Sequence, residues 1–316
     1  MTRISVVVPT RGGAQRLPRL IASLARQTHR DWEAIVVVDG DVDDSAGVVG
    51  KMSRDLPVRT VVLPENRGRS AALNAGFDAA TGDVLLRCDD DLELADDHLA
   101  RHVGHHDASP APVGVVGIYR NVFTPGTYAR VYGRRADESL RRGAYVAPAD
   151  HTWRYWAGNA SVSAATWQRV GPYDLRYRAY GWEDVDWGYR LHRHGVAVLV
   201  EPDVEVVHHA AASSAGDRAL RAYYSGAARR TFEALHAGDD ELPRLLPPPA
   251  QAPGAWGALV RAAARVADER TVQRLGSWSE HVAAVLPAWA GEKAVALLVE
   301  GASLGGYRAG RTEGRI

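Results

Sequence analysis

The chain has 316 residues, of which 46% are hydrophobic, so it is long enough for a large soluble domain with an appended region. Lys and Arg together number 38, as do Asp and Glu, and this balance does not favour a nucleic-acid partner or a strongly basic membrane face. The single cysteine, Cys88, excludes an internal disulfide and a multi-cysteine zinc site. It fits a reducing, cytoplasmic setting.

No stretch of the sequence approaches the roughly 20 consecutive apolar residues that a membrane-spanning helix needs. The N-terminal run MTRISVVVPT is too short for the apolar part of a signal peptide, and its β-branched residues favour a first strand. We therefore expect no transmembrane span, a cytoplasmic location, and contact with the inner face of a membrane only as a peripheral protein.

Short β-branched runs alternate with helical patterns up to about residue 120. The strands are expected at 4–9, 32–40, 58–64 and 83–89, and the helices at 16–27, 45–55 and 70–81. This alternation predicts an α/β fold with a mostly parallel, doubly wound sheet. Ligands of such sheets bind outside the carboxyl ends of the strands, so Pro9, Thr10, Asp39 and the acids at 89–91 should share one edge.

The remainder of the chain is less regular. Strands are expected within 113–123 and 197–209, separated by an aromatic-rich stretch and a helix that begins near Trp182. Residues 216–316 are expected to form a helical extension, with a proline-rich linker at 242–254 where proline should forbid both helix and strand pairing. This extension could form a homodimer face or rest on a membrane, but a packed helical cap is favoured.

Three consecutive acids, Asp89, Asp90 and Asp91, directly follow an apolar run that reads as a buried strand. Because alternate residues of a strand project to the same side, Asp89 and Asp91 can converge while Asp90 faces away. Paired carboxylate oxygens suit Mg²⁺ or Mn²⁺ with bound phosphate. A solvated acidic loop or a helix cap would explain the same residues.

A second pair of acids, Glu183 and Asp184, lies at the expected first turn of a helix. Held against Trp182 and Trp187, a carboxylate there could act as a general base, because apolar walls raise its pKa. The alternative is that both acids only offset the helix dipole.

Two adjacent histidines, His208 and His209, end a strand-like run. Neutral imidazole is a good ligand for Mn²⁺ and could complete a site begun by the acids. Neighbouring residues of a strand face opposite sides, so at most one of the two should enter the site. A purely structural histidine is the alternative.

Two arginines, Arg67 and Arg69, flank Gly68 immediately before an expected helix. Backbone N–H groups at a helix start, together with a guanidinium, suit a diphosphate. A plain helix cap through Ser70 explains the segment equally well.

Taken in order, SVVVPTRGG, AIVVVDGDVDDS, NRGRSAALNAGFDAATGDVLLRCDDDLEL and GWEDVDWGYRL resemble the family 2 glycosyltransferases of the GT-A fold, over roughly residues 3 to 210. The resemblance implies a GT-A domain at 1–215, with a nucleotide-sugar-binding half at 1–120 and an acceptor half at 121–215. It also implies metal-dependent, inverting transfer of a sugar from a nucleotide diphosphate sugar to a small-molecule, glycan or lipid-linked acceptor.

By position, the resemblance assigns roles to individual residues. Asp184 would be the general base, with Glu183 positioning the acceptor or the backbone, and Asp91 and His208 would hold the divalent metal. The side chains expected to bind the nucleotide sugar are Pro9, Thr10, Arg11, Asp39, Arg67, Ala71, Asp89, Asp90 and Trp182. The stretch WEDVDWGYRL is also similar to the C-terminal motif of metazoan galactosyltransferases, in which tryptophans pack beside donor sugar and acceptor.

One departure concerns Asp39, which is followed by Gly40 and Asp41 where family members often carry an acid and a serine. A rival interpretation is a sugar nucleotidyltransferase, for which Gly12, Gly13 and Arg16 offer a loop after the first strand, but this leaves the Glu183–Asp184 pair unexplained. A second rival is a sugar-nucleotide-binding protein of the same fold that has lost turnover.

Overall fold

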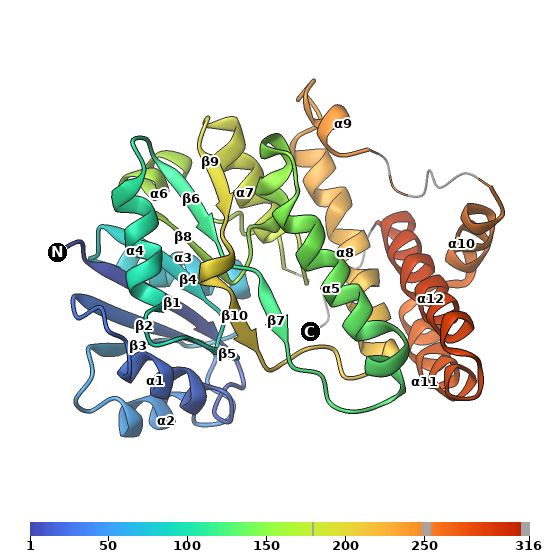
Figure 1. Ribbon diagram of the computed structural model, residues 1–316, viewed down its shortest axis with the longest axis horizontal. Coiled ribbons are helices and arrows are strands. Elements are labelled where there is room, and N and C mark those ends of the chain that lie inside the picture. Colours follow the sequence, from blue (N-terminus) through green and yellow to red (C-terminus); the bar gives the residue numbers. More distant parts are fainter. Residues whose placement is uncertain (179, 248, 250–253, 311–316) are drawn as a thin grey trace. The chain divides into compact units, whose positions relative to one another are not determined.

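The computed structural model describes residues 1–178, 180–247, 249 and 254–310 (Figure 1), which form two compact units. The first unit consists of Met1–Arg120, Arg141–Leu175 and Glu183–His209. The second consists of Asn121–Leu140, Arg176–Trp182 and the chain from Ala210 onward. The division near residue 210 lies close to the boundary expected at 215, and two earlier segments join the second unit.

A seven-stranded sheet forms the centre of the first unit. In spatial order its strands are β3 (Val58–Leu63), β2 (Trp32–Asp39), β1 (Ile4–Thr10), β4 (Val84–Cys88), β8 (Asn159–Ser163), β6 (Val113–Val116) and β9 (Ala197–Val200). The first four strands pair in parallel, as do β6 and β9, whereas β8 runs antiparallel to both of its neighbours. The predicted α/β fold with a mostly parallel sheet is confirmed.

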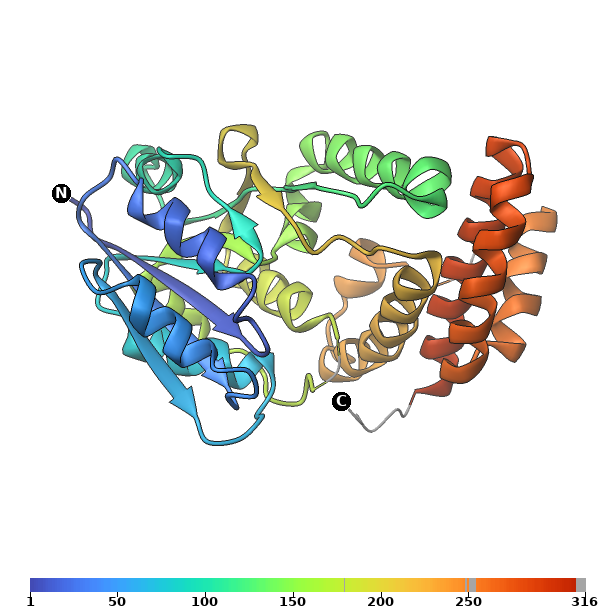
Figure 2. The same ribbon diagram turned by 90° about the horizontal axis from the view of Figure 1, so that it is seen from below.

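Helices cover both faces of this sheet, as the continuous apolar runs predicted. On one face Val6 and Val36 share a core with α1 (Leu17–Ala25), α2 (Ser45–Met52) and α4 (His98–Ala108). Figure 2 shows α1 and α2 on the same side of the strands. The alternate residues Val7 and Val37 face α3 (Arg69–Ala79), which approaches so closely at Gly76 that a Cβ there would collide with Val7.

A small second sheet lies beside the acidic triplet. Its strands, in spatial order, are β5 (Leu92–Glu93), β10 (Val206–His208) and β7 (Tyr119–Asn121). β10 runs antiparallel to β5, with His208 opposite Leu92. This pairing brings two segments that are more than 100 residues apart in sequence to the same place.

The helix that carries the second acidic pair, α7 (Glu183–Arg193), is held by an aromatic cluster. The ring of Trp187 lies 4.9 Å from Trp156, 5.5 Å from Trp167 and 5.7 Å from Tyr173, measured between centroids. Its indole N–H donates to the carbonyl oxygen of Gly171 at 2.9 Å. The other helical elements before residue 210 are η1 (Ala129–Gly133), α5 (Arg134–Tyr145), η2 (Ala149–Tyr155), α6 (Ala164–Val170) and η3 (Pro202–Val204).

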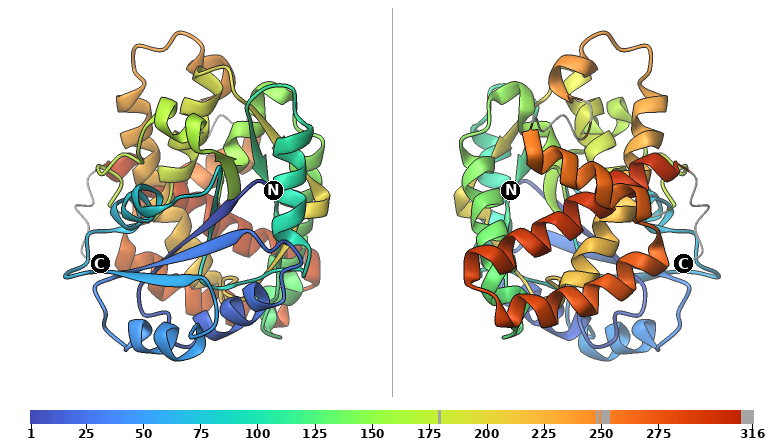
Figure 3. Two further views of the ribbon diagram at one scale, coloured as in Figure 1. Left: turned by 90° about the vertical axis from the view of Figure 1, so that its left-hand side faces the viewer. Right: turned by 90° about the vertical axis from the view of Figure 1, so that its right-hand side faces the viewer.

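The second unit is built on four long helices, and Figure 3 shows them from two sides. They are α8 (Ala215–Leu235), α10 (Gly254–Val266), α11 (Glu269–Val285) and α12 (Ala288–Ala309). α12 packs against the other three. Small residues such as Ala219 and Ala302 and the aliphatic Val295 fill the core, together with Tyr128 from the earlier segment. The predicted helical C-terminal region is therefore confirmed.

The expectation that proline forbids a helix throughout 242–254 is wrong at the start of that range. A short helix, α9 (Leu242–Leu245), has its proline in the first turn, where the missing N–H would have no partner in any case. Residues 248 and 250–253 lie outside the described residues. Among the described helices, none combines the length and the apolar character needed to cross a lipid bilayer.

Candidate functional site

The candidate site lies at the carboxyl ends of three adjacent strands, β2, β1 and β4. Asp39 ends β2, Thr10 ends β1, and Asp89 follows directly after β4. This is the edge at which ligands of parallel sheets bind.

A fully buried arginine, Arg87 of β4, connects the two groups of acids singled out in the sequence. One terminal nitrogen of its guanidinium lies 3.3 Å from Asp89 Oδ1, and the other forms an ion pair with Asp184 Oδ1. The guanidinium carbon also lies 5.9 Å from the centre of the Tyr173 ring. The expected donor-binding acid and the expected base therefore contact the same cation. This ion pair, rather than an apolar wall, is the environment of Asp184.

Asp89 is held in its ionised form. Its burial disfavours the charge, but Arg87, Arg69 and a hydrogen bond from Tyr119 outweigh that cost and lower the pKa of Asp89 below its ordinary value. The Tyr119 hydroxyl donates to Asp89 Oδ2 at 3.1 Å. Burial in turn raises the pKa of Tyr119 well above its ordinary value, so it remains a donor.

Asp91 lies against His208, the residue expected to be its partner at a metal. His208 Nε2 is 3.3 Å from Asp91 Oδ2, and its ring stacks on Tyr119 with 4.8 Å between centroids. The other oxygen, Asp91 Oδ1, is buried without a hydrogen-bond partner among the described residues. His209 faces away, with its Nε2 at 2.8 Å from Glu93. Of the adjacent histidines, only His208 thus directs its side chain to the acidic triplet, while the backbone N–H of His209 donates to the Asp91 carbonyl oxygen at 3.0 Å.

Asp90 points to the opposite side from its two neighbours. It accepts hydrogen bonds from the Thr10 hydroxyl and from Arg16, whose Nη2 lies 2.8 Å from Asp90 Oδ2. Burial raises the pKa of Asp90, although Arg16 and Thr10 partly offset this effect. Gly13 must lack a side chain here, because a Cβ would collide with Thr10 and lie 2.6 Å from Asp90 Oδ2. Thr10 and Asp90 are thus engaged with each other at the start of α1.

Asp39 fixes the loop that precedes α3. Its two oxygens accept the backbone N–H groups of Arg67 at 2.7 Å and Gly68 at 2.8 Å. The alternative cap through Ser70 does not form, since α3 begins at Arg69 and the buried Ser70 hydroxyl has no hydrogen-bond partner among the described residues.

The other residues expected at the nucleotide differ in exposure. The side chains of Arg11 and Arg67 are exposed, so both can reach a ligand at the strand ends. Pro9 and Ala71 are partly buried, the first in β1 and the second in α3.

Glu183 and Trp182 adjoin in sequence but lie in different units. Glu183 is 3% exposed and pairs with Arg69 at 3.3 Å, while its Oε2 has no hydrogen-bond partner among the described residues. Trp182 adopts φ +69°, a strained conformation for a bulky residue. Within the second unit its indole N–H donates to Ser225 at 3.1 Å, and its ring lies 5.1 Å from that of Phe232.

Arg87, Tyr119 and Tyr173 were not among the residues predicted from the sequence. A signal was present for Arg87, because a charged residue inside the otherwise apolar run VLLRC is costly unless it is paired. The two tyrosines carried no such signal, since only the fold brings them beside Arg87 and Asp89.

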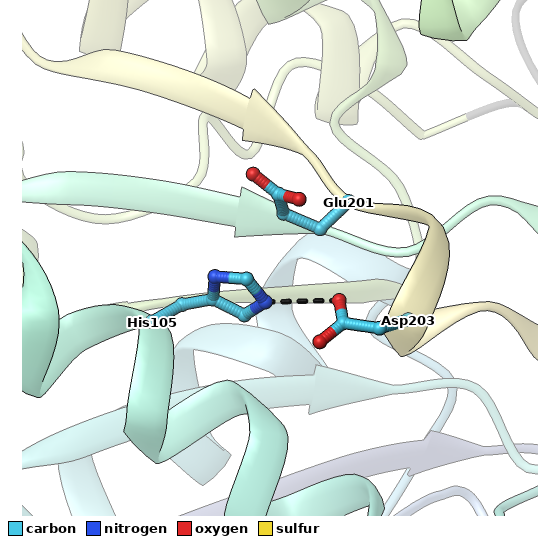
Figure 4. A group of neighbouring side chains, drawn as sticks. All are labelled: His105, Glu201 and Asp203. Carbon is cyan, nitrogen blue, oxygen red and sulfur yellow. Dashed lines mark hydrogen bonds and ion pairs between the residues drawn. The ribbon is translucent and has the colours of Figure 1, made fainter.

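A separate polar cluster lies at the carboxyl end of β9, and Figure 4 shows its three side chains. His105 of α4, Glu201 and Asp203 place one ligand atom each within 4.8 Å of the others. His105 Nε2 lies 2.9 Å from Asp203 Oδ1, and Asp203 is exposed. A surface ion pair accounts for this arrangement.

A family model described as glycosyl transferase family 2 matches residues 5–165, about half of the chain. The matched range contains Arg87, the acidic triplet and the Asp39 loop.

Two curated relatives share sequence with this chain. The validoxylamine A glucosyltransferase of Streptomyces hygroscopicus subsp. jinggangensis is 30% identical over 225 residues, covering 62% of this chain and 53% of the relative. The undecaprenyl-phosphate 4-deoxy-4-formamido-L-arabinose transferase of Pseudomonas fluorescens is 30% identical over 153 residues, covering 47% and 44%. The chain therefore spans about half the length of these relatives.

A solved structure with the same fold is the mannosyltransferase PcManGT of Pyrobaculum calidifontis, in complex with GDP-Man and Mn²⁺. It superposes with a TM-score of 0.60 over 95% of this chain and 86% of that protein, at 21% sequence identity. At this identity the likeness shows a shared fold.

Proposed function

Because this chain belongs to glycosyl transferase family 2, we propose that it is an inverting glycosyltransferase of the hexosyltransferase kind, with a nucleotide diphosphate sugar as donor and a divalent metal as cofactor. The fold of a mannosyltransferase that binds GDP-Man and Mn²⁺ supports both the donor class and the metal. The proposal assigns the donor to the carboxyl edge of β1, β2 and β4.

The residues proposed to hold the metal fit a hard divalent cation. Asp91 offers a buried oxygen that has no hydrogen-bond partner among the described residues, and His208 Nε2 lies 3.3 Å from its second oxygen. Carboxylate and imidazole donors suit Mn²⁺, and the carboxylate suits Mg²⁺ as well. When bound, the metal would offset the negative charge of the leaving diphosphate.

Asp184 is the proposed general base. Its carboxylate would accept the proton of the acceptor hydroxyl as that oxygen attacks the anomeric carbon from the face opposite the diphosphate. A single displacement of this kind inverts the anomeric configuration. Arg87 would orient Asp184 before the acceptor arrives, and Arg67 would lie on the diphosphate side.

One observation carries this proposal: the guanidinium of Arg87 pairs with Asp89 and Asp184 at once. Donor-binding acid and base must lie close together for in-line transfer, and a shared cation keeps them so despite their like charges. The rival interpretation as a sugar nucleotidyltransferase needs Arg16 at the phosphates, but this side chain is bonded to Asp90 and to the Gly12 carbonyl oxygen.

Asp184→Asn is the decisive variant. We expect it to lower kcat by about 10³-fold, because general-base catalysis contributes on the order of 10²–10⁴. Donor affinity, measured by calorimetry, should stay within about threefold of the native value since the amide keeps the shape of the side chain. Near-normal turnover would sink the assignment.

The matched control is Asp78→Asn on the exposed side of α3, which should leave kcat unchanged. Native protein that binds donor but neither transfers nor hydrolyses it would instead identify a protein of this fold without turnover.

The relatives differ in the acceptor that their names contain. One name contains validoxylamine A and the other contains a lipid phosphate, undecaprenyl phosphate. We propose a hydroxyl-bearing acceptor and leave both classes as substrates to be assayed. Transfer to either one, with release of a nucleoside diphosphate, would support the reaction class.

A further inference from the structure

Three helices of the second unit, α10, α11 and α12, enclose a cavity of about 200 Å³. Its inner wall includes the buried residues Val272, Ser279 and Ala302. Three of its lining residues are exposed and therefore border its opening: Val266, Leu275 and Trp278, of which Trp278 is 63% exposed. The cavity is larger than the ~150 Å³ engineered cavity that stays dry and binds benzene.

The lining is almost entirely apolar. Its one hydroxyl, that of Ser279, donates to the carbonyl oxygen of Gly276 at 2.8 Å, and the other polar side-chain atom of the lining is the indole nitrogen of the exposed Trp278. A peptide would bring N–H and C=O groups that must stay paired, and burying them here would be costly. A hydrocarbon chain carries no such groups and gains free energy with every methylene buried.

The helices that form the walls of the cavity are closely packed. α12 approaches α10 so closely that a Cβ on Gly301 would lie 2.8 Å from the Ala263 side chain, and one on Gly305 would lie 2.7 Å from that of Ala267. These contacts fix the separation of the two helices next to the cavity, so a ligand would enter a preformed space.

Positive charge lies beside the opening. Arg270, Arg274 and Trp278 follow one another at intervals of four residues, so they form one exposed row along α11. The neighbouring acids have other partners, since Asp268 accepts the Thr271 N–H at 2.8 Å and Glu269 bonds with Tyr224, although Asp268 also attracts Arg270 electrostatically. Among the described residues, no carboxylate lies within ion-pair distance of Arg270 or Arg274. The row therefore suits an anionic head group next to an apolar chain.

We propose that this cavity binds the single hydrocarbon chain of an amphiphile whose phosphate-like head group pairs with Arg270 and Arg274. The ligand enters as a monomer, because the cavity holds one chain segment. Binding is measured without any donor, so its failure would leave the transferase proposal untouched, and failed transfer would leave this one untouched.

The test is a calorimetric series of hexyl, octyl and decyl phosphate below their critical micelle concentrations. Affinity should rise about fourfold per methylene from hexyl to octyl, which corresponds to ~0.8 kcal/mol for each buried CH₂. Octyl glucoside, with the same chain and an uncharged head, should bind about tenfold more weakly than octyl phosphate. Inorganic phosphate alone should not bind measurably, and equal binding of phosphate would overturn the role of the chain.

Ala294→Trp fills the cavity and should weaken octyl phosphate at least tenfold. Its control is Ala288→Trp, an exposed site on the same helix that is not part of the lining and should stay within twofold. Arg270→Gln combined with Arg274→Gln should abolish the preference for phosphate over glucoside, whereas Arg54→Gln, exposed in the first unit, should not. Unchanged octyl phosphate binding in Ala294→Trp would refute the proposal.

Three further arms keep the test decisive. In native protein, octyl phosphate with a diazirine at the chain end should label residues 263–282 or 294–302, and labelling elsewhere would overturn the site. Vesicles of phosphatidylglycerol that bind native protein and Ala294→Trp equally would indicate surface adsorption instead. A native dimer that Ala294→Trp dissociates, seen by sedimentation, would identify a second copy as the occupant.

Discussion

Arg87 is a charged side chain with no exposed surface in a strand that is otherwise apolar. Its desolvation is compensated by Asp89 and Asp184, which lie at its two terminal nitrogens, and by the nearby Glu183. Arg87 in turn lowers the pKa of Asp89, although the burial of that carboxylate opposes the effect.

Arg87→Met should therefore destabilise the protein by about 3 kcal/mol, because it leaves two partly buried carboxylates without their cation. Urea unfolding at pH 7 measures this loss. Arg26→Met, which breaks the exposed ion pair with Asp96, is the matched control and should cost less than about 1 kcal/mol. Equal losses for the two variants would contradict the compensation described for Arg87.

Asp91 is the residue at which the proposed metal dependence can be tested separately from folding. Asp91→Asn should raise the Mn²⁺ concentration for half-maximal transfer at least tenfold, because an amide oxygen carries no charge. A titration of Mn²⁺ into chelator-treated enzyme checks this, with the exposed Asp96→Asn as control. Full activity of native protein in excess chelator would exclude the proposed role.

At the scale of elements, the strands and helices of residues 1–120 followed from the sequence. β1, β2, β3 and β4 and the helices α1, α2 and α3 each lie within a few residues of their expected ranges, because every strand is apolar throughout or bounded by turn residues. The antiparallel direction of β8 could not be predicted. It depends on pairing with β4 and β6, and its own residues, NASVS, contain little information about direction.

The contact between α8 and α12 rests on glycines. A Cβ on Gly226 would collide with the Ser303 carbonyl oxygen, and one on Gly306 would collide with the Tyr223 carbonyl oxygen. The two helices thus approach at backbone distance, which no larger residue would permit.

Gly226→Ala should consequently lower stability by about 1–3 kcal/mol, even though alanine is the better helix former. Thermal unfolding followed by circular dichroism provides the measurement. Gly238→Ala serves as control because its Cβ would have no neighbour within 4 Å. A neutral Gly226→Ala would show that the helices separate easily at this point.

At the scale of the whole molecule, a row of histidines links stability to pH. Burial lowers the pKa of His98 and of His106 to about 4, and that of His102 well below its ordinary value. His98 and His102 share the side-chain oxygen of Asn159, at 3.0 and 3.3 Å. All three histidines must be neutral in the folded protein.

Stability should be full above pH 6.5 and fall as the pH drops toward 4, since the unfolded chain binds protons that the folded chain excludes. His98 alone should cost about 2 kcal/mol by pH 5, given its pKa of about 4 in the folded state. Urea midpoints at pH 7.5 and pH 5 test this. His98→Gln should reduce the slope, while His194→Gln, an exposed histidine, should not. A stability independent of pH over this range would be inconsistent with buried neutral imidazoles.

The acidic residues of the candidate site could be predicted from the sequence, but the contacts between the site residues could not. Asp89, Asp91, Glu183, Asp184 and His208 were identified because they lie at the ends of expected strands and at the start of an expected helix, in an ordered set of motifs that resembles the family. The pairing of Asp184 with Arg87 was not, since it joins residues 97 positions apart through the packing of α7 on the sheet. For Trp182, the motif predicted a donor contact, which stays a prediction, but it carried no sign of the packing of this side chain on Ser225 and Phe232.

Because the two units are interleaved in the sequence, the helical unit is hard to exchange between proteins, whether by recombination or by engineering. The polypeptide passes between the units at five joins: Arg120–Asn121, Leu140–Arg141, Leu175–Arg176, Trp182–Glu183 and His209–Ala210. Tyr128 and Val131 precede α6, α7 and β9 of the first unit in the sequence, yet they belong to the core formed with α8 and α12. Cutting the gene at a single point near codon 210 would therefore separate these two side chains from the residues of α8 and α12 that they pack against. The helical region therefore cannot be exchanged through a single crossover. Any transfer of it to another protein must include residues 121–140 and 176–182.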